Sequence, residues 1–197
     1  MAYAQSFAWW ASASPNECDF RIGTIDTPQR GSQGHRPLAG VGLEPAARIR
    51  GGIGVGYISQ TFRCSHDKNL SRVGFHAKVQ LFPSQLITMT VQDRRAMLDL
   101  GVPGSAGYLS TEGGIPIDYE FFRQMILSGS VGHQNNRFNN LDRVDHRIAT
   151  RAGATYRLNR TASPELRYDR LDPSSHGADR DRAYVDNRLM AGVTLRR

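Results

Sequence analysis

The chain has 197 residues, of which 39% are hydrophobic and 22% charged, and this balance excludes a wholly disordered protein. The formal net charge of +7 suits an anionic partner such as nucleic acid, acidic polysaccharide or lipopolysaccharide, without identifying one. No apolar run reaches the roughly 18 residues of a membrane-spanning helix.

Residues 1–47 differ in composition from the rest of the chain. They contain both tryptophans, Trp9 and Trp10, and the Gly/Pro-rich tract "DTPQRGSQGHRPLAGVGLEP", which has no clear period. The start of the chain also lacks the basic region of a signal peptide. We predict an atypical, poorly ordered segment over residues 1–47 and one β-domain over residues 48–197.

Alternating polar and apolar residues begin near Arg48. In "VGFHAKVQL" (73–81), one face is apolar from Val73 to Leu81, and the other carries His76 and Lys78. In "RIATRAGATYRL" (147–158), apolar and small residues alternate with arginines in the same way. Because a strand turns successive side chains to opposite faces, both segments are predicted to be two-faced strands.

The same pattern predicts about eight strands, most of them near the ten residues of a tilted strand that crosses a bilayer. They cover residues 51–62, 73–81, 86–94, 107–121, 124–136, 147–158, 164–171 and 187–196.

Short turns alternate along the chain with longer polar connections, as in outer-membrane barrels. The short ones are 82–85, 121–124 and 159–163, and the long ones are 63–70, 95–106, 136–142 and 172–182. We predict an all-β, antiparallel, up-and-down transmembrane β-barrel, or part of one, after an irregular N-terminal segment.

The arginines indicate which face of each strand contacts water. An arginine that faces lipid at the bilayer midplane costs about 2–4 kcal/mol, so a slip of the 147–158 strand by one residue is strongly disfavoured. Mixed charge in a narrow lumen favours a hydrogen-bonded ladder, and in a wider lumen it favours anions. The lumen-facing candidates are Lys78, Arg94, Asp118, Arg147, Arg151, Arg157, Glu165, Arg167, Asp169, Asp186 and Arg188.

Other functions fit the pattern less well. Nucleic-acid binding requires clustered cations with stacking aromatic residues, whereas these arginines are dispersed at one or two per strand. His133, Asp145 and His146 suggest acid–base chemistry, yet no serine lies in a nucleophile elbow and no histidine pair has metal-ligand spacing. We predict no enzyme activity, no cofactor, no metal site and no nucleic-acid partner.

Three stretches, residues 107–138, 151–172 and 181–197, contain the motifs Gly107–Leu109, Asp118–Glu120, Gly153–Arg160 and Asn187–Leu195. With these motifs, about residues 50–197 resemble the C-terminal part of bacterial outer-membrane proteins of the putative β-barrel porin type 2 family. The resemblance implies an outer-membrane barrel, often met in exopolysaccharide production or export, without catalytic residues or cofactor. Family members are longer and begin with a signal peptide, so the chain is expected to be a C-terminal half-barrel from a truncated or mis-started gene.

Two functions remain open from the sequence. The first is a porin-like outer-membrane protein for passage or export of a solute such as exopolysaccharide. Its expected partners are outer-membrane lipid, lipopolysaccharide, polysaccharide or a small anionic solute, and an oligomer or a missing N-terminal half-barrel. The second is a soluble periplasmic antiparallel β-protein that binds an anionic polymer. An eight-stranded barrel alone has an interior filled by side chains, so a wide pore requires further strands.

Overall fold

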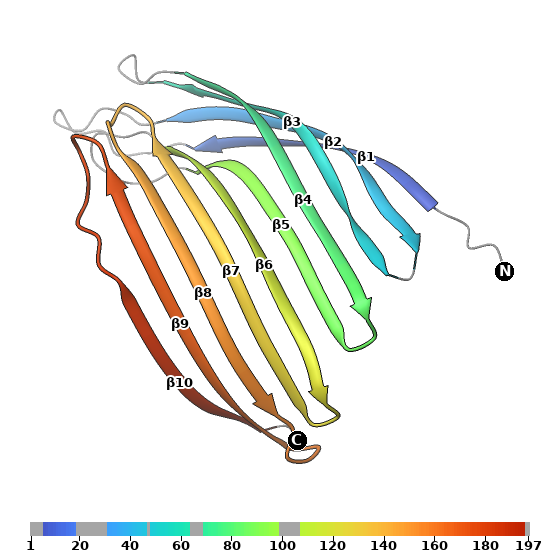
Figure 1. The fold of residues 1–197 in the computed structure, drawn as a ribbon. Coiled ribbons are helices and arrows are strands. Elements are labelled where there is room, and N and C mark those ends of the chain that lie inside the picture. The colour runs from blue at the N-terminus through green and yellow to red at the C-terminus, as the bar shows by residue number, and fades with distance from the viewer. Residues whose placement is uncertain (1–5, 19–30, 47, 64–68, 99–106, 196–197) are drawn as a thin grey trace.

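The computed structural model describes residues 6–18, 31–46, 48–63, 69–98 and 107–195. These residues form one sheet of ten antiparallel strands (Figure 1). No helix in the described ranges is long and apolar enough to cross a membrane. The strands are β1 (Ser6–Cys18), β2 (Ser32–Ala46), β3 (Ile49–Phe62), β4 (Leu70–Ser84), β5 (Ile87–Leu98), β6 (Tyr108–Phe122), β7 (Met125–Phe138), β8 (Val144–Tyr156), β9 (Ala162–His176) and β10 (Asp186–Leu195).

Each strand pairs only with its neighbours in the chain, so the sheet is an up-and-down meander with β1 and β10 at its edges. The hairpins β4–β5, β6–β7 and β8–β9 turn tightly at one end of the sheet, and the β7–β8 and β9–β10 connections lie at the other end (Figure 1). The β8–β9 turn is set locally, because the Asn159 Oδ1 atom accepts hydrogen bonds from the backbone N–H groups of Thr161 and Ala162. The short β4–β5 and β6–β7 turns and the long β9–β10 connection are as expected from the sequence, whereas the β7–β8 and β8–β9 connections, residues 139–143 and 157–161, are equal in length.

The prediction for the N-terminal segment was wrong for most of its length. Ser6–Cys18 and Ser32–Ala46 are β1 and β2; β2 pairs with β3 with a register shift between Leu43 and Ala46, and the two strands raise the count from eight to ten. The alternation of β2 is weakened because Gly34, Gly40 and Gly42 occupy inward positions and present neither a polar nor an apolar side chain there. The Trp10 ring takes that space, over Gly40 and Gly54. Residues 19–30 and 47 lie outside the described ranges.

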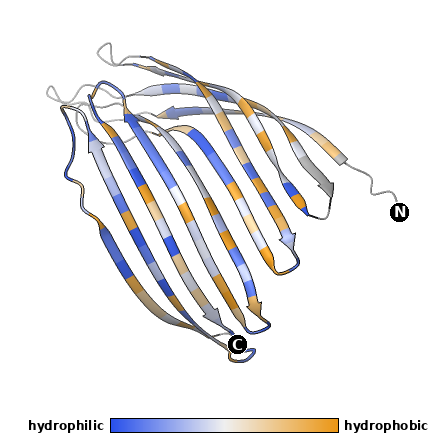
Figure 2. Ribbon diagram, viewed as in Figure 1, coloured by the Kyte–Doolittle hydropathy of each residue, from blue (hydrophilic) through white to orange (hydrophobic). Residues whose placement is uncertain are grey.

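One face of the sheet is an apolar belt. On β8 the side chains of this face run from Ile148 to Tyr156 without a charge, and register continues the belt onto neighbouring strands through Val131 and Leu166. These side chains are uncovered: Ile148 is 55% exposed and Val131 57%. Figure 2 shows the resulting alternation of hydrophobic and hydrophilic residues along each strand. On β9 the belt is interrupted beside Thr150 and Ile148 by the paired charges of Arg170 and Asp172. The exposed apolar surface over the rest of the face is anomalous in water and expected in lipid.

The height of the belt fits a bilayer. Five outward residues on β8, from Ile148 to Tyr156, cover about 27 Å along the strand at about 3.4 Å per residue. A tilt of about 40° reduces this to about 21 Å across the membrane, close to the roughly 25 Å apolar band of outer-membrane barrels. Tyr119, Phe121 and Phe122 form a ring cluster at the tight-turn end, where the centroids of the last two lie 4.3 Å apart. Aromatic residues at this level are typical of an interfacial girdle.

The opposite face is concave. Gln92 on β5 and Arg188 on β10 line the same cavity of about 490 Å³, although their strands are five positions apart in the sheet. Side chains so far apart share a cavity only if the sheet curls toward their face. Register places the polar phase of the strands on this concave face and the belt on the convex face.

Candidate functional site on the concave face

Register places ten of the eleven predicted lumen residues on the concave face: Lys78, Arg94, Asp118, Arg147, Arg151, Glu165, Arg167, Asp169, Asp186 and Arg188. Arg157 lies beyond β8, which ends at Tyr156, and belongs to the turn. Its backbone N–H donates to the Gln124 carbonyl across the neighbouring turn. Polar and apolar residues continue to alternate in the sequence for one step after the strand has ended.

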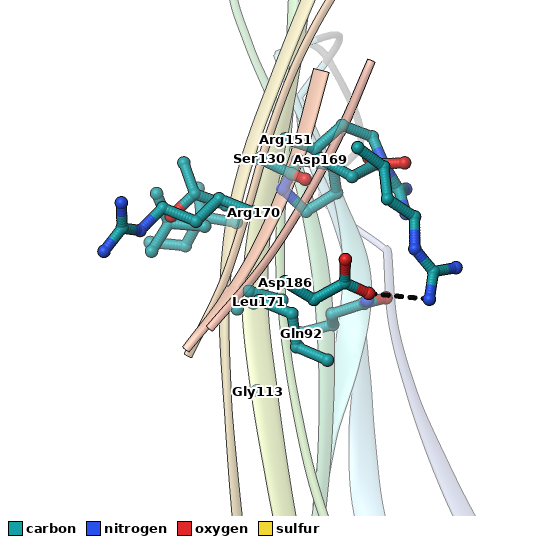
Figure 3. A pocket seen from close by; sticks show the side chains of 16 residues that line it. Gln92, Gly113, Ser130, Arg151, Asp169, Arg170, Leu171 and Asp186 are labelled. Atoms are coloured by element: carbon teal, nitrogen blue, oxygen red, sulfur yellow. Dashed lines mark hydrogen bonds and ion pairs between the residues drawn. The ribbon is translucent and has the colours of Figure 1, made fainter. Parts of the chain in front are cut away.

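The concave face of β8–β10 carries a ladder of paired charges. Arg151 Nε lies 2.6 Å from Asp169 Oδ1, and Arg167 Nε lies 3.2 Å from Asp169 Oδ2. Farther along, Arg188 Nη2 lies 2.6 Å from Asp186 Oδ2. Figure 3 shows Arg151 and Asp169 on one side of the strands and Arg170 on the other, as alternation requires.

The charges around the first cavity balance. Its volume is about 490 Å³, and the concave-face charges that line it are Arg151 and Arg188 against Asp169 and Asp186. Each of these cations has a carboxylate partner. The wall therefore offers many donors and acceptors but little net field.

A second cavity, of about 500 Å³, is lined with excess positive charge. Lys78, Arg94 and Arg147 line it from β4, β5 and β8, against Glu112 and Asp93. Register places the Glu112 side chain on the concave face and the Asp93 side chain on the convex face. Arg94 Nη2 pairs with Glu112 Oε1 at 2.6 Å, and Arg147 Nη1 donates to Gln134 Oε1 at 3.3 Å. Within the described ranges, neither Lys78 nor Arg147 forms an ion pair. This cavity is the cationic site of the concave face.

The concave face of β1–β4 is filled, apart from the part of β4 where His76 and Lys78 line the second cavity. Ile58 is 2% exposed and Leu38 7% exposed, and the Trp10 ring covers the adjacent glycines. Gln60 is buried among them, where its amide donates to Ser32 Oγ at 2.9 Å and its Oε1 atom accepts from Asn16 at 3.3 Å. The sequence prediction missed this packing. The only sequence feature that indicated this packing was that Gly52, Gly54 and Gly56 in "GGIGVG" lie at every second position, on one face of the strand.

A polar clamp joins the β7–β8 and β9–β10 connections at the end opposite the tight turns. Arg143 Nη2 lies 2.6 Å from Asp145 Oδ2 and 3.3 Å from Asp181 Oδ2. Asp142 Oδ2 accepts the backbone N–H of Ala178 at 3.0 Å. The hydrogen bonds to Asp145 raise the pKa of the Arg143 guanidinium, so this side of the clamp stays positively charged. The clamp holds one connection against the other.

The histidines considered for catalysis do not meet their carboxylate. Asp145 lies on the concave face and is bound by Arg143 and by the Ser175 hydroxyl at 2.6 Å, whereas His133 and His146 lie on the convex face. Among the described residues, no cluster of three or more histidine, cysteine or acidic side chains has the proximity of a metal site. The arrangement can bind and orient solutes by hydrogen bonds and charge.

Comparison with solved structures places the fold among outer-membrane porins. The chain superposes on the NanC porin with a TM-score of 0.51 and 12% identity, over 98% of each chain. It superposes on OmpT, an outer membrane protein of Vibrio cholerae, with a TM-score of 0.51 and 12% identity, over 95% of this chain and 60% of that one. At this identity the likeness shows the fold alone. Among curated proteins, none matches the sequence significantly.

The family is shown by the sequence. The family model described as Putative beta-barrel porin 2 matches residues 4–197, and so includes the N-terminal segment that composition had set apart. The apolar belt and the porin neighbours agree with this match. The chain belongs to the putative beta-barrel porin 2 family and is an outer-membrane β-protein of porin-like class.

Proposed function

We propose that this chain forms the wall of an outer-membrane pore that passes small hydrophilic solutes and prefers anions. One observation carries the proposal: Lys78 and Arg147 face the second cavity without a carboxylate partner in the described ranges, whereas Arg151, Arg167 and Arg188 are all paired. The unbalanced cations give this part of the wall a positive potential.

The size of the effect is adequate for selectivity. Two unit charges 4 Å apart interact by about 1 kcal/mol in bulk water and by about 4 kcal/mol at the effective dielectric constant near a protein surface. A difference of about 1.4 kcal/mol is a tenfold preference. Two cations without ion-pair partners on the wall of a pore are therefore sufficient to favour anions over cations.

Acidic saccharides are the solute class that this wall fits best. Gln92 and Gln134 present amide groups beside Lys78 and Arg147, and the paired arginines of the first cavity supply further donors. Amides and guanidinium groups exchange hydrogen bonds with sugar hydroxyls, and the free cations attract a carboxylate. Passage of an acidic polysaccharide, one sugar unit after another, is an extension of the same proposal.

Single-channel recording in planar bilayers tests the proposal. Under a KCl gradient, the wild-type chain should give a reversal potential on the anion side, and galacturonate should block the current more than galactose. Lys78→Gln together with Arg147→Gln should reduce the anion-to-cation permeability ratio by roughly three- to tenfold. Arg157→Gln, in the turn, serves as the matched control. A cation-selective wild type, or a double variant with unchanged selectivity, contradicts the proposal.

A further inference from the structure

Beyond the belt, toward the end opposite the tight turns, the convex face carries polar and charged side chains in place of apolar ones. On β5 the outward residues after Val91 are Asp93 and Arg95, and on β7 those after Val131 are His133, Asn135 and Arg137. The strands continue past the apolar belt, so these side chains project outward from a regular sheet. The sequence had assigned residues 95–106 to a connection, and β5 extends that strand to Leu98.

Arg95 is held against the outer surface. Its Nε atom donates to Thr111 Oγ1 at 3.0 Å, and its guanidinium carbon lies 5.0 Å from the centroid of the Phe75 ring on β4. No described residue accepts a hydrogen bond from its Nη atoms, so the outer edge of the guanidinium fork is available. An arginine held on an aromatic ring, with no described partner at its Nη atoms, is preorganised for a bidentate anion.

Neighbouring strands extend this surface with polar groups of the same kind. Arg95 is paired across strands with Thr111, and Thr111 with Asn135, so the three stand in one row. Arg137 lies two residues beyond Asn135 on the same face of β7 and is exposed. The row thus combines two guanidinium groups with a hydroxyl and an amide, directly above a surface that requires lipid.

We propose that this outer row, formed by Arg95, Thr111, Asn135 and Arg137, binds the phosphorylated sugar headgroup of lipopolysaccharide. The long connections of an outer-membrane barrel lie on the external side, where the facing leaflet consists of phosphorylated glycolipid. The guanidinium groups match the phosphates and the hydroxyl and amide match the sugar. The proposal requires the membrane placement of the chain, but it does not depend on anion passage.

Asp93 makes it possible to test whether the outer row binds the lipid through the negative charge of the lipid. It is the outward residue next to Arg95 on β5, and its Oδ1 atom is buried without a hydrogen-bond partner. A carboxylate beside a phosphate site repels the ligand, so Asp93→Asn should tighten binding of the phosphorylated lipid.

The test measures binding of lipid A to the full chain, refolded in neutral detergent, by native mass spectrometry and by thermophoresis. Wild type should bind bisphosphorylated lipid A more tightly than dephosphorylated lipid A. Arg95→Gln and Arg137→Gln should each weaken the phosphorylated form by about fivefold and leave the dephosphorylated form unchanged. Arg147→Gln, on the concave face, is the matched control and should leave lipid binding unchanged even where conductance falls.

Three outcomes overturn the proposal. Equal affinity of wild type for the two lipids shows that phosphate is not recognised. Competition by inorganic phosphate at the same concentration as lipid A shows a general anion site without lipid specificity. Unchanged binding in an Arg95→Gln, Arg137→Gln double variant that keeps its heat-modifiable gel mobility shows that the outer row is not the site.

Discussion

The concave face is filled by side chains over β1–β3 and part of β4, and it is open from Lys78 on β4 to β10. The convex face carries the apolar belt along both regions, interrupted on β9 by Arg170 and Asp172. Over β1–β4 the inward phase holds glycines together with Trp10, Leu38 and Ile58, which pack against one another. Over β5–β10 it holds charged and amide side chains around two cavities. The same alternation therefore builds a packed interior or a wet one, according to which residues occupy the inward positions.

The two regions contribute differently to stability and function. The arginine side chain in the Arg151–Asp169 pair is 57% exposed, and ion pairs of that kind contribute only about 0–1 kcal/mol. Burial of Ile58 and Leu38, by contrast, contributes about 1.5–3 kcal/mol for each side chain. We expect the β1–β4 region to determine how firmly the sheet holds its curvature, and the β5–β10 region to determine what passes along it.

The largest expected effect comes from placing an arginine on the convex face and, for comparison, on the concave face of one strand. Ala152 lies in the middle of the belt on β8, and Ala149 lies on the concave face of the same strand. Ala152→Arg should lower the free energy of unfolding in lipid by about 2–4 kcal/mol, because it exposes a guanidinium to hydrocarbon. Ala149→Arg should change it by less than about 0.5 kcal/mol, as for other uncrowded surface sites. Urea unfolding in vesicles measures both, and equal effects contradict the orientation of the sheet.

A smaller effect separates the filled from the open region. A Cβ atom at Gly54 meets the Trp10 ring, whereas one at Gly192 lies 3.7 Å from the end of the flexible Glu165 side chain. Gly54→Val should destabilise the protein by about 1–3 kcal/mol through overpacking, and Gly192→Val should have little effect. Trp10→Ala should partly rescue Gly54→Val, as seen by heat-modifiable mobility and urea unfolding. Absence of rescue would falsify the packing of Trp10 over β3.

The smallest expected effect on stability comes from removing one carboxylate of the paired charges. Asp169→Asn removes the carboxylate shared by Arg151 and Arg167, so the free energy of unfolding should fall by no more than about 1 kcal/mol. The anion-to-cation permeability ratio should rise, because two cations lose their counter-charge. Asp172→Asn, whose side chain is on the convex face and paired with Arg170, is the control. A fall in anion preference for Asp169→Asn contradicts the proposed pore lining.

The prediction for the candidate site depended on local alternation, and it failed where alternation was uninformative. Lys78, Arg147 and Arg151 were assigned to one face because a strand has a period of two, and register puts them together on the concave face. Arg157 was included because the sequence continues to alternate after the chain has turned. Trp10 was missed because its neighbours on the concave side are glycines, which give no pattern.

Ion pairs and cavities could not be predicted from the sequence. The alternation places Arg94, Arg151 and Asp169 on the inward phase, but it does not tell which strands are neighbours or how they are offset. The Arg94–Glu112 and Arg151–Asp169 pairs depend on the register between β5 and β6 and between β8 and β9. That register is set by turns and by packing across strands.

By itself, the sequence determined that this protein is a β-meander with one apolar and one charged face and with turns of unequal length at its two ends. These are properties of neighbouring residues, which a strand converts into faces without further information. Only the tertiary structure decided that there are ten strands, that β1–β4 fill their concave side and that Lys78 and Arg147 stand without carboxylate partners in the described ranges. Those features depend on curvature and on contacts between strands that are distant in the chain, and local patterns carry no record of either.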